Sequence, residues 1–557
     1  MPESLNIAER LREVARRYPH QRAVVCPVGR ARAGRVAYAQ LTFEQLDQET
    51  DRLARGLSRL GVEPGMRLVL MVRPSLEFVT LTFALFKAGV VIVLIDPGMG
   101  RSNVFRCLEE VEPDGFVAIP LVHAVRVVSR RRFPQAKVNV TVGGRRWGWG
   151  GVTYEQLLGE AWTPYESVRT LPDDPAAIIF TSGSTGPPKG VLYLHSIFDA
   201  QVDLLREFFH IQPGEVSLSA FPLFSLFDAA MGVTTIIPDM DPTRPARVDP
   251  EKILQAIRDH GVTQAFGSPA MWNRISRHCE QSEQTIPCLR RVISAGAPVP
   301  IRLIERMLGV LEREDADIYT PYGATESLPV ACISGRDVLK ETAELSRKGA
   351  GTCVGRVFPG ITVRIIPIVD GPIRTIDDVQ ELPPGQIGEI IVQGPVVTPQ
   401  YVRKPEATAE AKIADPAGLW HRMGDVGYRD QQGRLWFCGR KAHIVHTDSG
   451  PLFPVPCEAI FNEHSNVYRS ALVGVGPKGK QRPVIVVEPE PGYFPRTHQQ
   501  REEFTEQLLK RAAAEPLTQS IRTVLFHPSL PVDVRHNVKI GREQLSVWAE
   551  RELAASD

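Results

Sequence analysis

Apolar positions in the first part of the chain alternate between the helical and the strand period. Thr42 is a suitable helix N-cap, and the apolar residues after it recur at helical spacing, at Phe43, Leu46, Leu53 and Leu57. A strand pattern follows at 67–72, and the alternation continues through 78–95 and 115–119. This order is typical of a doubly wound α/β protein, and the length before Gly394 leaves room for two such layers.

The apolar run at 78–95 is close to the length that spans a membrane, but it contains Lys87 and a break at Gly89. A helix followed by a buried parallel strand explains the run better, with a turn at 96–98. The N-terminus has no apolar signal-peptide core and instead predicts an amphipathic helix, with one face formed by Ile7, Leu11 and Val14. We therefore expect no transmembrane segment and no secretion signal.

The stretch TSGSTGPPKG at 181–190 follows the apolar run 176–180, which predicts a buried strand that ends in a flexible turn. Glycines let backbone amides turn inward as an anion-binding nest, hydroxyls add donors, and Lys189 supplies a cation for the outer phosphates of a nucleotide. Gly190 follows the lysine in place of the Ser or Thr of a Walker loop. The residues expected to form this phosphate cradle are Ser182, Gly183, Ser184, Thr185 and Gly186.

Two further strand patterns, 292–298 and 318–326, end in tight turns that are rich in small residues. Small residues at strand ends let a flat ring or a phosphate approach the backbone. Glu326, at the end of the second turn, is well placed to hold a cation beside phosphates. The segment 138–151 is too glycine-rich for the interior of an element and predicts a loop or hairpin.

Composition limits the broad class of the protein. A chain of 557 residues is expected to form two or more domains, and its formal net charge of +1 gives no overall attraction to nucleic acid or to an anionic membrane. The basic cluster Arg130-Arg131-Arg132 is interpreted first as solvated surface and second as a partner contact. Eight scattered cysteines without a CxxC pair indicate neither a disulfide framework nor a zinc site, which favours a reducing cytoplasm, and Cys438 and Cys457 are expected to be buried.

Five motifs occur in the order and rough spacing of the acyl-adenylate-forming superfamily, which includes acyl-CoA synthetases, luciferases and the adenylation domains of peptide synthetases. They are TSGSTGPPKG, SAGAP at 294–298, YGATE at 322–326, HRMGD at 421–425 and Gly439-Arg440. The resemblance covers nearly the whole chain. It implies an α/β fold in which a large N-terminal domain of α/β layers, residues 1–439, is joined by a hinge to a smaller, mobile C-terminal α+β domain, residues 440–557.

The resemblance also implies ATP and Mg²⁺ as cofactors. By position, the loop from Thr181 to Lys189 resembles the one that holds the ATP phosphates, and Thr325 and Glu326 match the phosphate and magnesium positions. The adenine is then expected between two segments, Gly296-Ala297-Pro298 and Tyr322-Gly323-Ala324.

Three more residues take their roles from the same resemblance. Asp425 resembles the carboxylate that accepts both ribose hydroxyls, which suits a group with two acceptor oxygens, and Arg440 resembles the arginine that contacts the ribose. Lys539 resembles the lysine that reaches the carboxylate being activated and stabilises charge as it develops there. Val538 stands where the family has glycine.

Three segments tied to the second, thiol-accepting step differ from acyl-CoA synthetases. Ala442 stands in place of the aspartate that follows the hinge arginine, and 446–452 lacks the usual Gly-x-Arg. The Pro-x-Phe-His pattern of many thioester-forming members reads PLFS at 222–225. Because the adenylation positions are kept, these differences favour adenylation without coenzyme A.

A hydroxyl on the substrate itself could then accept the acyl group, since a well-oriented neighbouring group gains an effective molarity on the order of 10⁵ M or more. The chain closely resembles the β-lactone synthetases of bacterial long-chain olefin biosynthesis in SAGAPVP, TPYGATES, AGTCVGRV, HRMGDVGY, GRLWFCGRKAH and VRHNVKIGRE. The implied substrate is a long-chain 2-alkyl-3-hydroxy acid. Its acyl-AMP closes to a β-lactone and releases AMP, and other olefin-pathway enzymes are candidate partners.

Two other functions fit the sequence: a long-chain fatty acyl-CoA synthetase with an altered hinge, and a non-catalytic acyl- or nucleotide-binding homologue. The base that would deprotonate the 3-hydroxyl is left open among Asp228, His443 and His536, each of which also suits a structural role. The aromatic stretch 221–228 suits a pocket wall and plain core equally. Phe224, Leu226 and Phe227 are the residues predicted to line an alkyl pocket.

Overall fold

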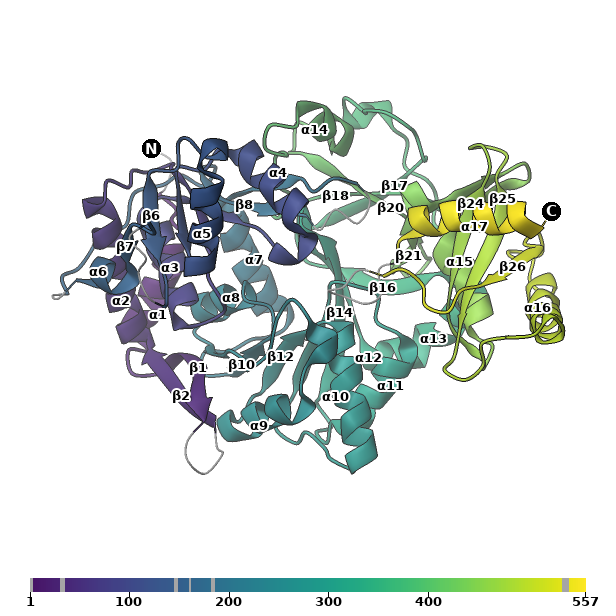
Figure 1. Cartoon of the computed structure of the whole chain (residues 1–557), viewed down its shortest axis with the longest axis horizontal. Coiled ribbons are helices and arrows are strands. Elements are labelled where there is room, and N and C mark those ends of the chain that lie inside the picture. Colours follow the sequence, from purple (N-terminus) through teal and green to yellow (C-terminus); the bar gives the residue numbers. More distant parts are fainter. Residues whose placement is uncertain are drawn as a thin grey trace.

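The computed structural model describes residues 4–30, 36–144, 149–159, 162–181, 186–532 and 540–556. These residues form a large α/β body, and a smaller C-terminal part lies at one end of it (Figure 1). Two sheets form the body, as the two predicted layers require, and the C-terminal part has a sheet of its own. The predicted α/β fold is confirmed.

The smaller of the two body sheets has the strand order β7-β6-β5-β3-β4-β8-β9 and is parallel except for the β8–β9 hairpin. Its strands are β3 (Arg67–Met71), β4 (Val91–Leu94), β5 (Gly115–Ala118), β6 (Val138–Thr141), β7 (Val152–Thr153), β8 (Pro175–Phe180) and β9 (Gly190–Leu194). Most of these strands are continuously apolar, which suits parallel strands covered on both faces. The strands predicted at 67–72 and 115–119 are therefore confirmed.

The prediction of a loop or hairpin at 138–151 is wrong at its start, because 138–141 forms β6. This strand pairs in parallel with β5, and its carbonyl at Val138 lies against Gly115, where a Cβ atom would stand only 2.0 Å away. Residues 138–141 therefore form a strand because they pair with β5, which is distant in sequence.

Helices cover this sheet and continue the pattern read from the sequence: α1 (Ala8–Arg17), α2 (Phe43–Arg59), α3 (Leu76–Lys87), α4 (Arg101–Val111), α5 (Pro120–Val128), α6 (Tyr154–Leu158) and α7 (His195–Phe208). Thr42 caps α2 in a capping box with Gln45, as its position predicts. The run 78–95 consists of α3 and β4, and within the described ranges no helix has both the length and the apolar character needed to cross a membrane.

The larger body sheet has the order β17-β18-β20-β21-β16-β15-β14-β13-β12-β10-β11-β1-β2. Its strands are β1 (Arg22–Arg30), β2 (Val36–Thr42), β10 (Val216–Ser219), β11 (Thr234–Ile236), β12 (Gln264–Gly267), β13 (Arg291–Ser294), β14 (Asp317–Ala324), β15 (Ser327–Ser334), β16 (Thr352–Val357), β17 (Thr362–Ile366), β18 (Gly388–Gln393), β20 (Trp420–Arg429) and β21 (Leu435–Arg440). Pairing is parallel from β1 through β11, β10, β12 and β13 to β14, and antiparallel from β14 to β17. The short β19 (Lys412–Ile413) pairs with β20.

The helices that accompany the larger sheet are α8 (Phe224–Met231), α9 (Pro250–His260), α10 (Pro269–Ser282), α11 (Ile301–Val310), α12 (Gly335–Asp337), α13 (Ala343–Leu345) and α14 (Pro405–Ala411). The C-terminal part contains the ribbon β22 (Val445–Thr447) and β23 (Gly450–Leu452), the sheet β24 (Val467–Val475), β25 (Arg482–Pro489) and β26 (Thr523–Phe526), and α15 (Pro454–Asn462), α16 (His498–Ala513) and α17 (Arg542–Ser556). Two apolar clusters in this part draw all their members from Val445 onward, so it has a core of its own. Cys438 and Cys457 are buried, as predicted.

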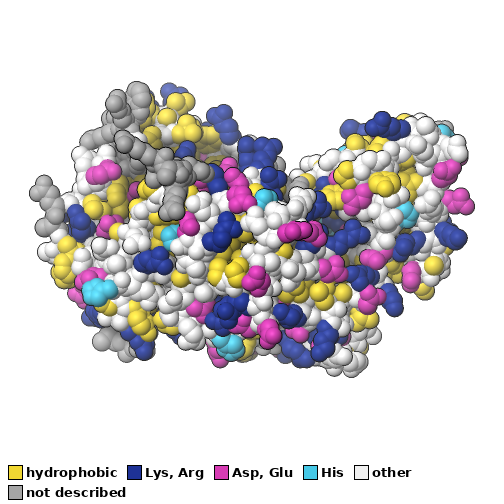
Figure 2. Space-filling model, turned by 90° about the horizontal axis from the view of Figure 1, so that it is seen from below, with side chains coloured by type: hydrophobic (Ala, Val, Ile, Leu, Met, Phe, Trp, Pro, Cys, Tyr) yellow, Lys and Arg dark blue, Asp and Glu magenta, His cyan; other side chains and the backbone are white. Residues whose placement is uncertain are grey.

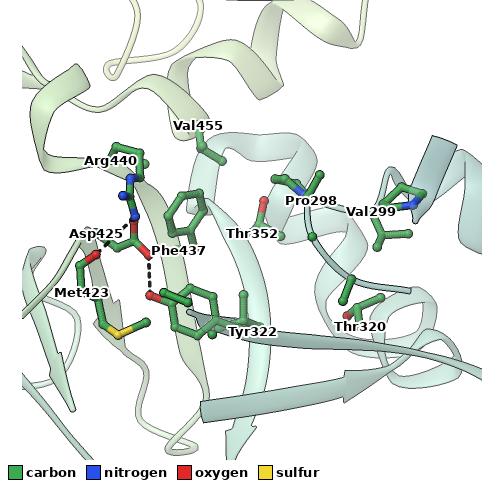
Figure 3. Close-up of a pocket in the computed structure, with 18 of the residues that line it drawn as sticks. Pro298, Val299, Thr320, Tyr322, Thr352, Met423, Asp425, Phe437, Arg440 and Val455 are labelled. Carbon is green, nitrogen blue, oxygen red and sulfur yellow. Dashed lines mark hydrogen bonds and ion pairs between the residues drawn. The ribbon is translucent and has the colours of Figure 1, made fainter. Parts of the chain in front are cut away.

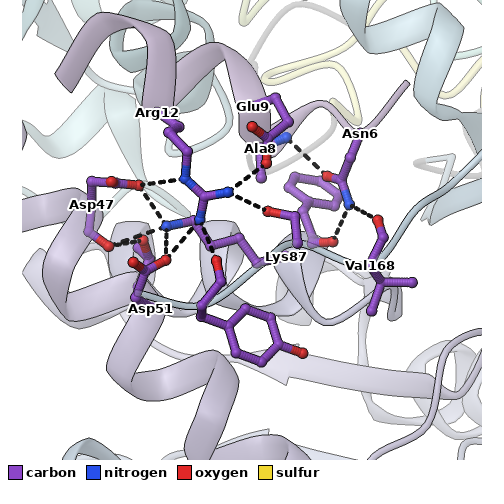
Figure 4. Close-up of polar contacts among 12 residues, drawn as sticks. Asn6, Ala8, Glu9, Arg12, Asp47, Asp51, Lys87 and Val168 are labelled. Carbon is purple, nitrogen blue, oxygen red and sulfur yellow. Dashed lines mark hydrogen bonds and ion pairs between the residues drawn. The ribbon is translucent and has the colours of Figure 1, made fainter. Parts of the chain in front are cut away.

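A buried ionic cluster joins α1, α2 and α3 (Figure 4). The Nζ atom of Lys87, whose side chain is fully buried, donates to Asp47 Oδ1 at 2.5 Å and to Asp51 Oδ1 at 2.6 Å. Arg12 Nη2 also donates to Asp51, at 2.8 Å. Lys87 therefore orders the helix packing with its charge fully paired, which explains how a lysine is accommodated within this apolar run.

Asp51→Ala is expected to destabilise the body by about 3 kcal/mol, because it leaves the buried Lys87 ammonium with Asp47 as its remaining carboxylate partner. The shift of the urea unfolding midpoint measures the effect. Asp203→Ala is the control, since its side chain is 44% exposed and its pairs with Arg10 and Arg206 should contribute less than about 1 kcal/mol. Equal shifts in the two variants would contradict the prediction.

Candidate functional site

A cavity of about 2140 Å³ lies between the body and the C-terminal part. Its walls include strand ends of both body sheets and residues of α15 and β24. Figure 2 shows the surface hollowed between the two parts of the molecule. Polar strand ends line one region of this cavity and aromatic side chains line another, so a single space offers both kinds of surface.

The loop at 181–190 connects the hairpin strands β8 and β9. Its two ends are held together, because Thr181 N donates to the Lys189 carbonyl at 3.0 Å and Lys189 N donates to Thr181 Oγ1 at 3.1 Å. Thr181, Gly186 and Lys189 line the cavity. The other residues predicted for the phosphate cradle lie outside the described residues: Ser182, Gly183, Ser184 and Thr185.

The two predicted turns lie side by side because β13 and β14 are parallel neighbours in the larger sheet. Ligands bind in α/β folds beyond the carboxyl ends of such strands. Gly296 has a φ of +92°, a conformation that L-residues avoid, and a Cβ atom on Gly323 would lie 2.9 Å from the Ser327 carbonyl oxygen. The residues predicted to hold the adenine all line the cavity: Gly296, Ala297, Pro298, Tyr322, Gly323 and Ala324.

Asp425 and Arg440 are directly opposite each other on β20 and β21. Arg440 Nη1 donates to Asp425 Oδ1 at 2.7 Å and to the Met423 carbonyl at 3.2 Å, while the Tyr322 hydroxyl donates to Asp425 Oδ2 at 2.7 Å (Figure 3). Burial, followed by the Asp425 charge, raises the pKa of Tyr322 well above its usual value, and the Asp425 charge raises the pKa of Arg440. The register of β20 and β21 thus brings Asp425 and Arg440 together, and Tyr322 of β14 holds the second carboxylate oxygen.

Glu326 contacts a residue that the sequence analysis missed. The Tyr401 hydroxyl donates to Glu326 Oε1 at 2.7 Å, and Lys189 Nζ lies 4.7 Å from the centre of the Tyr401 ring. Burial and then the Glu326 charge raise the pKa of Tyr401, so it stays a donor at neutral pH. Tyr193 donates to the Thr325 carbonyl at 2.6 Å, which fixes the same turn. No sequence signal joins Tyr401 to Glu326, because 75 positions separate them.

The cavity has an apolar wall built from α8 and the residues before it. Phe221, Leu223, Phe224, Leu226 and Phe227 line the cavity, and the Phe224 ring stacks on Phe266 with centroids 3.6 Å apart. Leu226 and Phe227 are also more than nine-tenths buried. The stretch 221–228 therefore contributes to the core and also to the wall of the pocket. Residue types alone could not distinguish these two roles, because apolar and aromatic side chains suit either one.

The three candidate bases differ in position. Asp228 lies in the core, where Ser219 and Thr235 donate to its Oδ2 at 2.6 and 2.9 Å, and burial raises its pKa to about 6. His443, in the short helix η7 (Lys441–His443), lines the cavity, and its pKa is lowered to about 4 by burial and by Arg542. His536 lies outside the described residues.

Lys539 also lies outside the described residues, but the chain directly after it reaches the cavity. Ile540 and Arg542 line the cavity wall. Arg542 Nη2 donates to both oxygens of the buried Glu458, at 2.7 and 2.8 Å, which anchors the start of α17 on α15.

The chain has relatives among known proteins. A family model described as AMP-binding enzyme matches residues 11–402. The chain is 47% identical over 554 residues to an olefin beta-lactone synthetase of Xanthomonas campestris pv. campestris, covering 98% of each protein. It is also 47% identical to an olefin beta-lactone synthetase of Stenotrophomonas maltophilia, covering 99% of each. Among solved structures, ATP-bound MatB from Rhodopseudomonas palustris is similar, with a TM-score of 0.77, 21% identity and coverage of 98% of this chain and 99% of that one.

The structural similarity, at 21% identity, supports the fold alone. The family assignment depends on the model match across most of the chain and on the full-length similarity at 47% identity. Both agree with the motifs at 181–190, 294–298, 322–326 and 421–425. The chain belongs to the AMP-binding enzyme family.

Proposed function

We propose that the protein is an ATP-dependent, AMP-forming β-lactone synthetase that acts on a long-chain 2-alkyl-3-hydroxy acid. The full-length similarity to two olefin beta-lactone synthetases supports this function. The structural observation that carries the proposal is the single cavity that joins the polar strand ends at 296–298, 322–326 and 425 to the aromatic wall at 221–227. A nucleotide fits the first region and alkyl chains fit the second.

The ATP half of the reaction is assigned to residues that meet at the polar region. Gly296–Pro298 and Tyr322–Ala324 would enclose the adenine, and Asp425 would accept the ribose hydroxyls beside Arg440. The loop Thr181–Lys189 and Thr325 would donate to the phosphates. The substrate carboxylate would then attack the α-phosphorus, the bond to the β-phosphate would break, and pyrophosphate would leave while Lys539 stabilises the developing charge.

Magnesium is proposed to bind beside Glu326. Among the described residues, no group of three or more His, Cys, Asp or Glu side chains could hold a metal ion. Mg²⁺ commonly uses one or two carboxylates together with substrate phosphates, which is why a single glutamate is proposed. When bound, the ion would neutralise phosphate charge, and the Tyr401 hydroxyl would orient the Glu326 carboxylate toward it.

Ring closure is proposed to need no second substrate. The 3-hydroxyl oxygen would attack the acyl carbonyl, its proton would pass to a base, the carbonyl–phosphate bond would break, and AMP would leave with the β-lactone formed. Of the candidate bases, His443 is the one within the described part that lines the cavity. Phe224, Leu226 and Phe227 would hold alkyl chains. The altered segments at 222–225, 442 and 446–452 support a reaction without coenzyme A.

A hinge after Gly439 is part of the same proposal, with domains at 1–439 and 440–557. The separate apolar clusters beyond Val445 support this boundary, as does the position of Arg440 at the end of β21.

We also propose a cytoplasmic location, which the eight free cysteines support, and contacts with other olefin-pathway enzymes. Co-purification of the tagged protein with its pathway neighbours tests those contacts.

The proposed reaction is tested with purified protein, a 2-alkyl-3-hydroxy acid, ATP and Mg²⁺, with and without coenzyme A. Mass spectrometry should identify a β-lactone together with AMP and pyrophosphate, at a rate that coenzyme A does not change. A thioester formed only with coenzyme A would instead establish the acyl-CoA synthetase. The absence of pyrophosphate release with any long-chain acid would favour the non-catalytic homologue.

A further inference from the structure

One lysine near the polar region of the cavity is buried without a partner. Lys412, on β19, is 8% exposed, and its Nζ atom is buried without a hydrogen-bond partner among the described residues. Buried ammonium groups are nearly always paired, because an unpaired charge loses its hydration without compensation. Lys87 is also buried, but it is bonded to two carboxylates, as expected for a buried lysine with a structural role.

A histidine lies directly opposite this lysine. His421 on β20 is the antiparallel partner of Lys412, is 2% exposed, and has its Nδ1 atom buried without a hydrogen-bond partner in the same described set. His421 lines the cavity, as does Ala411, which precedes Lys412 in the chain. Two neighbouring basic side chains, His421 at the cavity wall and Lys412 directly beside it, therefore have unused donors or acceptors.

The position of this pair in the cavity indicates what it faces. Asp425 is four residues further along β20, which places the proposed ribose acceptor roughly 13 Å from His421 along the strand. Lys189 and Glu326, which share Tyr401, lie within electrostatic reach of the pair, because the charge of Lys189 acts on His421 and that of Glu326 acts on Lys412. The pair is thus close to the lysine of the phosphate loop and to Glu326.

The electrostatic surroundings agree with this placement. Burial lowers the pKa of His421 well below its usual value, and the nearby charges of Lys412, Arg440 and Lys189 lower it further. Burial lowers the pKa of Lys412 to about 7, and the charge of Glu326 opposes that shift. Asp425 is paired with Arg440, so Lys189 and Lys412 are the cations that remain beside Glu326. Two cations beside one carboxylate suit a multiply charged anion.

We infer that Lys412 and His421 form a subsite for a polyphosphate, with the lysine as its cation and the uncharged His421 ring as a hydrogen-bonding group; the polyphosphate is the β,γ-diphosphate of ATP before transfer and inorganic pyrophosphate afterwards. The inference depends on the proposed function and adds to it two positioning residues that the motifs do not contain. A bound polyphosphate would supply the negative charge that the buried ammonium lacks. In its absence the lysine lowers stability, which is a common property of binding residues.

Inorganic pyrophosphate and AMP, used separately as probes, test the inference by calorimetry without turnover. In Lys412→Met, which keeps the length of the side chain but removes its charge, pyrophosphate should bind about tenfold more weakly or worse. AMP lacks the outer phosphates and should bind within about twofold of wild type. The melting temperature should rise, because the variant no longer buries an unpaired charge. Lys137→Met, at an exposed lysine, is the matched control and should change none of these values.

Two further variants complete the test. Lys412→Arg should restore most of the pyrophosphate affinity, and His421→Gln should weaken pyrophosphate while leaving AMP unchanged. Unchanged pyrophosphate affinity in Lys412→Met, or a lower melting temperature with equal losses for AMP and pyrophosphate, would overturn the inference and assign the lysine a structural role. A wild-type protein that binds neither AMP nor ATP would contradict the proposed function itself, so the two failures are distinguishable.

Discussion

Asp425→Asn is expected to lower kcat/KM for ATP by about a hundredfold or more, since several charge-assisted hydrogen bonds are lost together. The carboxylate accepts from Tyr322 and Arg440 through different oxygens, which leaves the remaining lone pairs for the two ribose hydroxyls of the proposed complex. An amide turns one acceptor into a donor and removes the charge paired with the partly buried Arg440. Pyrophosphate release at varied ATP concentration measures the effect.

The weaker binding caused by Asp425→Asn should appear for ATP and for AMP but not for the lipid substrate. KM for the hydroxy acid should stay within about twofold of wild type, because the aromatic wall at 221–227 is a separate region of the cavity. Asp377→Asn, at an exposed aspartate, is the matched control and should behave as wild type. An Asp425→Asn enzyme with normal ATP affinity would remove Asp425 from the proposed ribose site.

Lys539→Ala is expected to reduce pyrophosphate release at least about a hundredfold while ATP still binds, because a single donor aimed at developing charge contributes mainly in the transition state. The next residue in the chain, Ile540, lines the cavity. Arg542, bonded to both oxygens of Glu458, anchors the same segment. Single-turnover assays together with ATP binding by calorimetry separate chemistry from binding.

The contact between Arg542 and Glu458 offers an independent check on the segment that follows Lys539. Glu458→Gln should lower kcat by a smaller factor, because it loosens the Arg542 contact without removing the lysine. Lys137→Ala is the surface control for Lys539→Ala. If Lys539→Ala turns over at the wild-type rate, the activated carboxylate is stabilised by another group and the proposed role is wrong.

Much of the fold and of the nucleotide region could be predicted because the signals are local. Thr42 and Gln45 form a capping box within one helical turn, and the turns at 294–298 and 322–326 follow their strands directly. The segment at 138–141 could not be predicted, since its strand exists through pairing with β5. Tyr401 was missed for a similar reason: its contact with Glu326 is made across 75 positions.

The sequence by itself determined the α/β class, the family, and most of the residues that meet at the polar region of the cavity. Periodicity and short motifs record interactions between near neighbours in the chain. Those interactions were sufficient to predict the fold class, the family and these residues. The tertiary structure alone decided that Asp425 has both oxygens held by Tyr322 and Arg440, and that the stretch 221–228 lines a pocket. It alone decided that Lys87 is paired and that Lys412 has no hydrogen-bond partner among the residues the structure describes. The physical reason is that charge pairing and desolvation depend on what the rest of the fold brings within a few ångströms, and no local pattern records that.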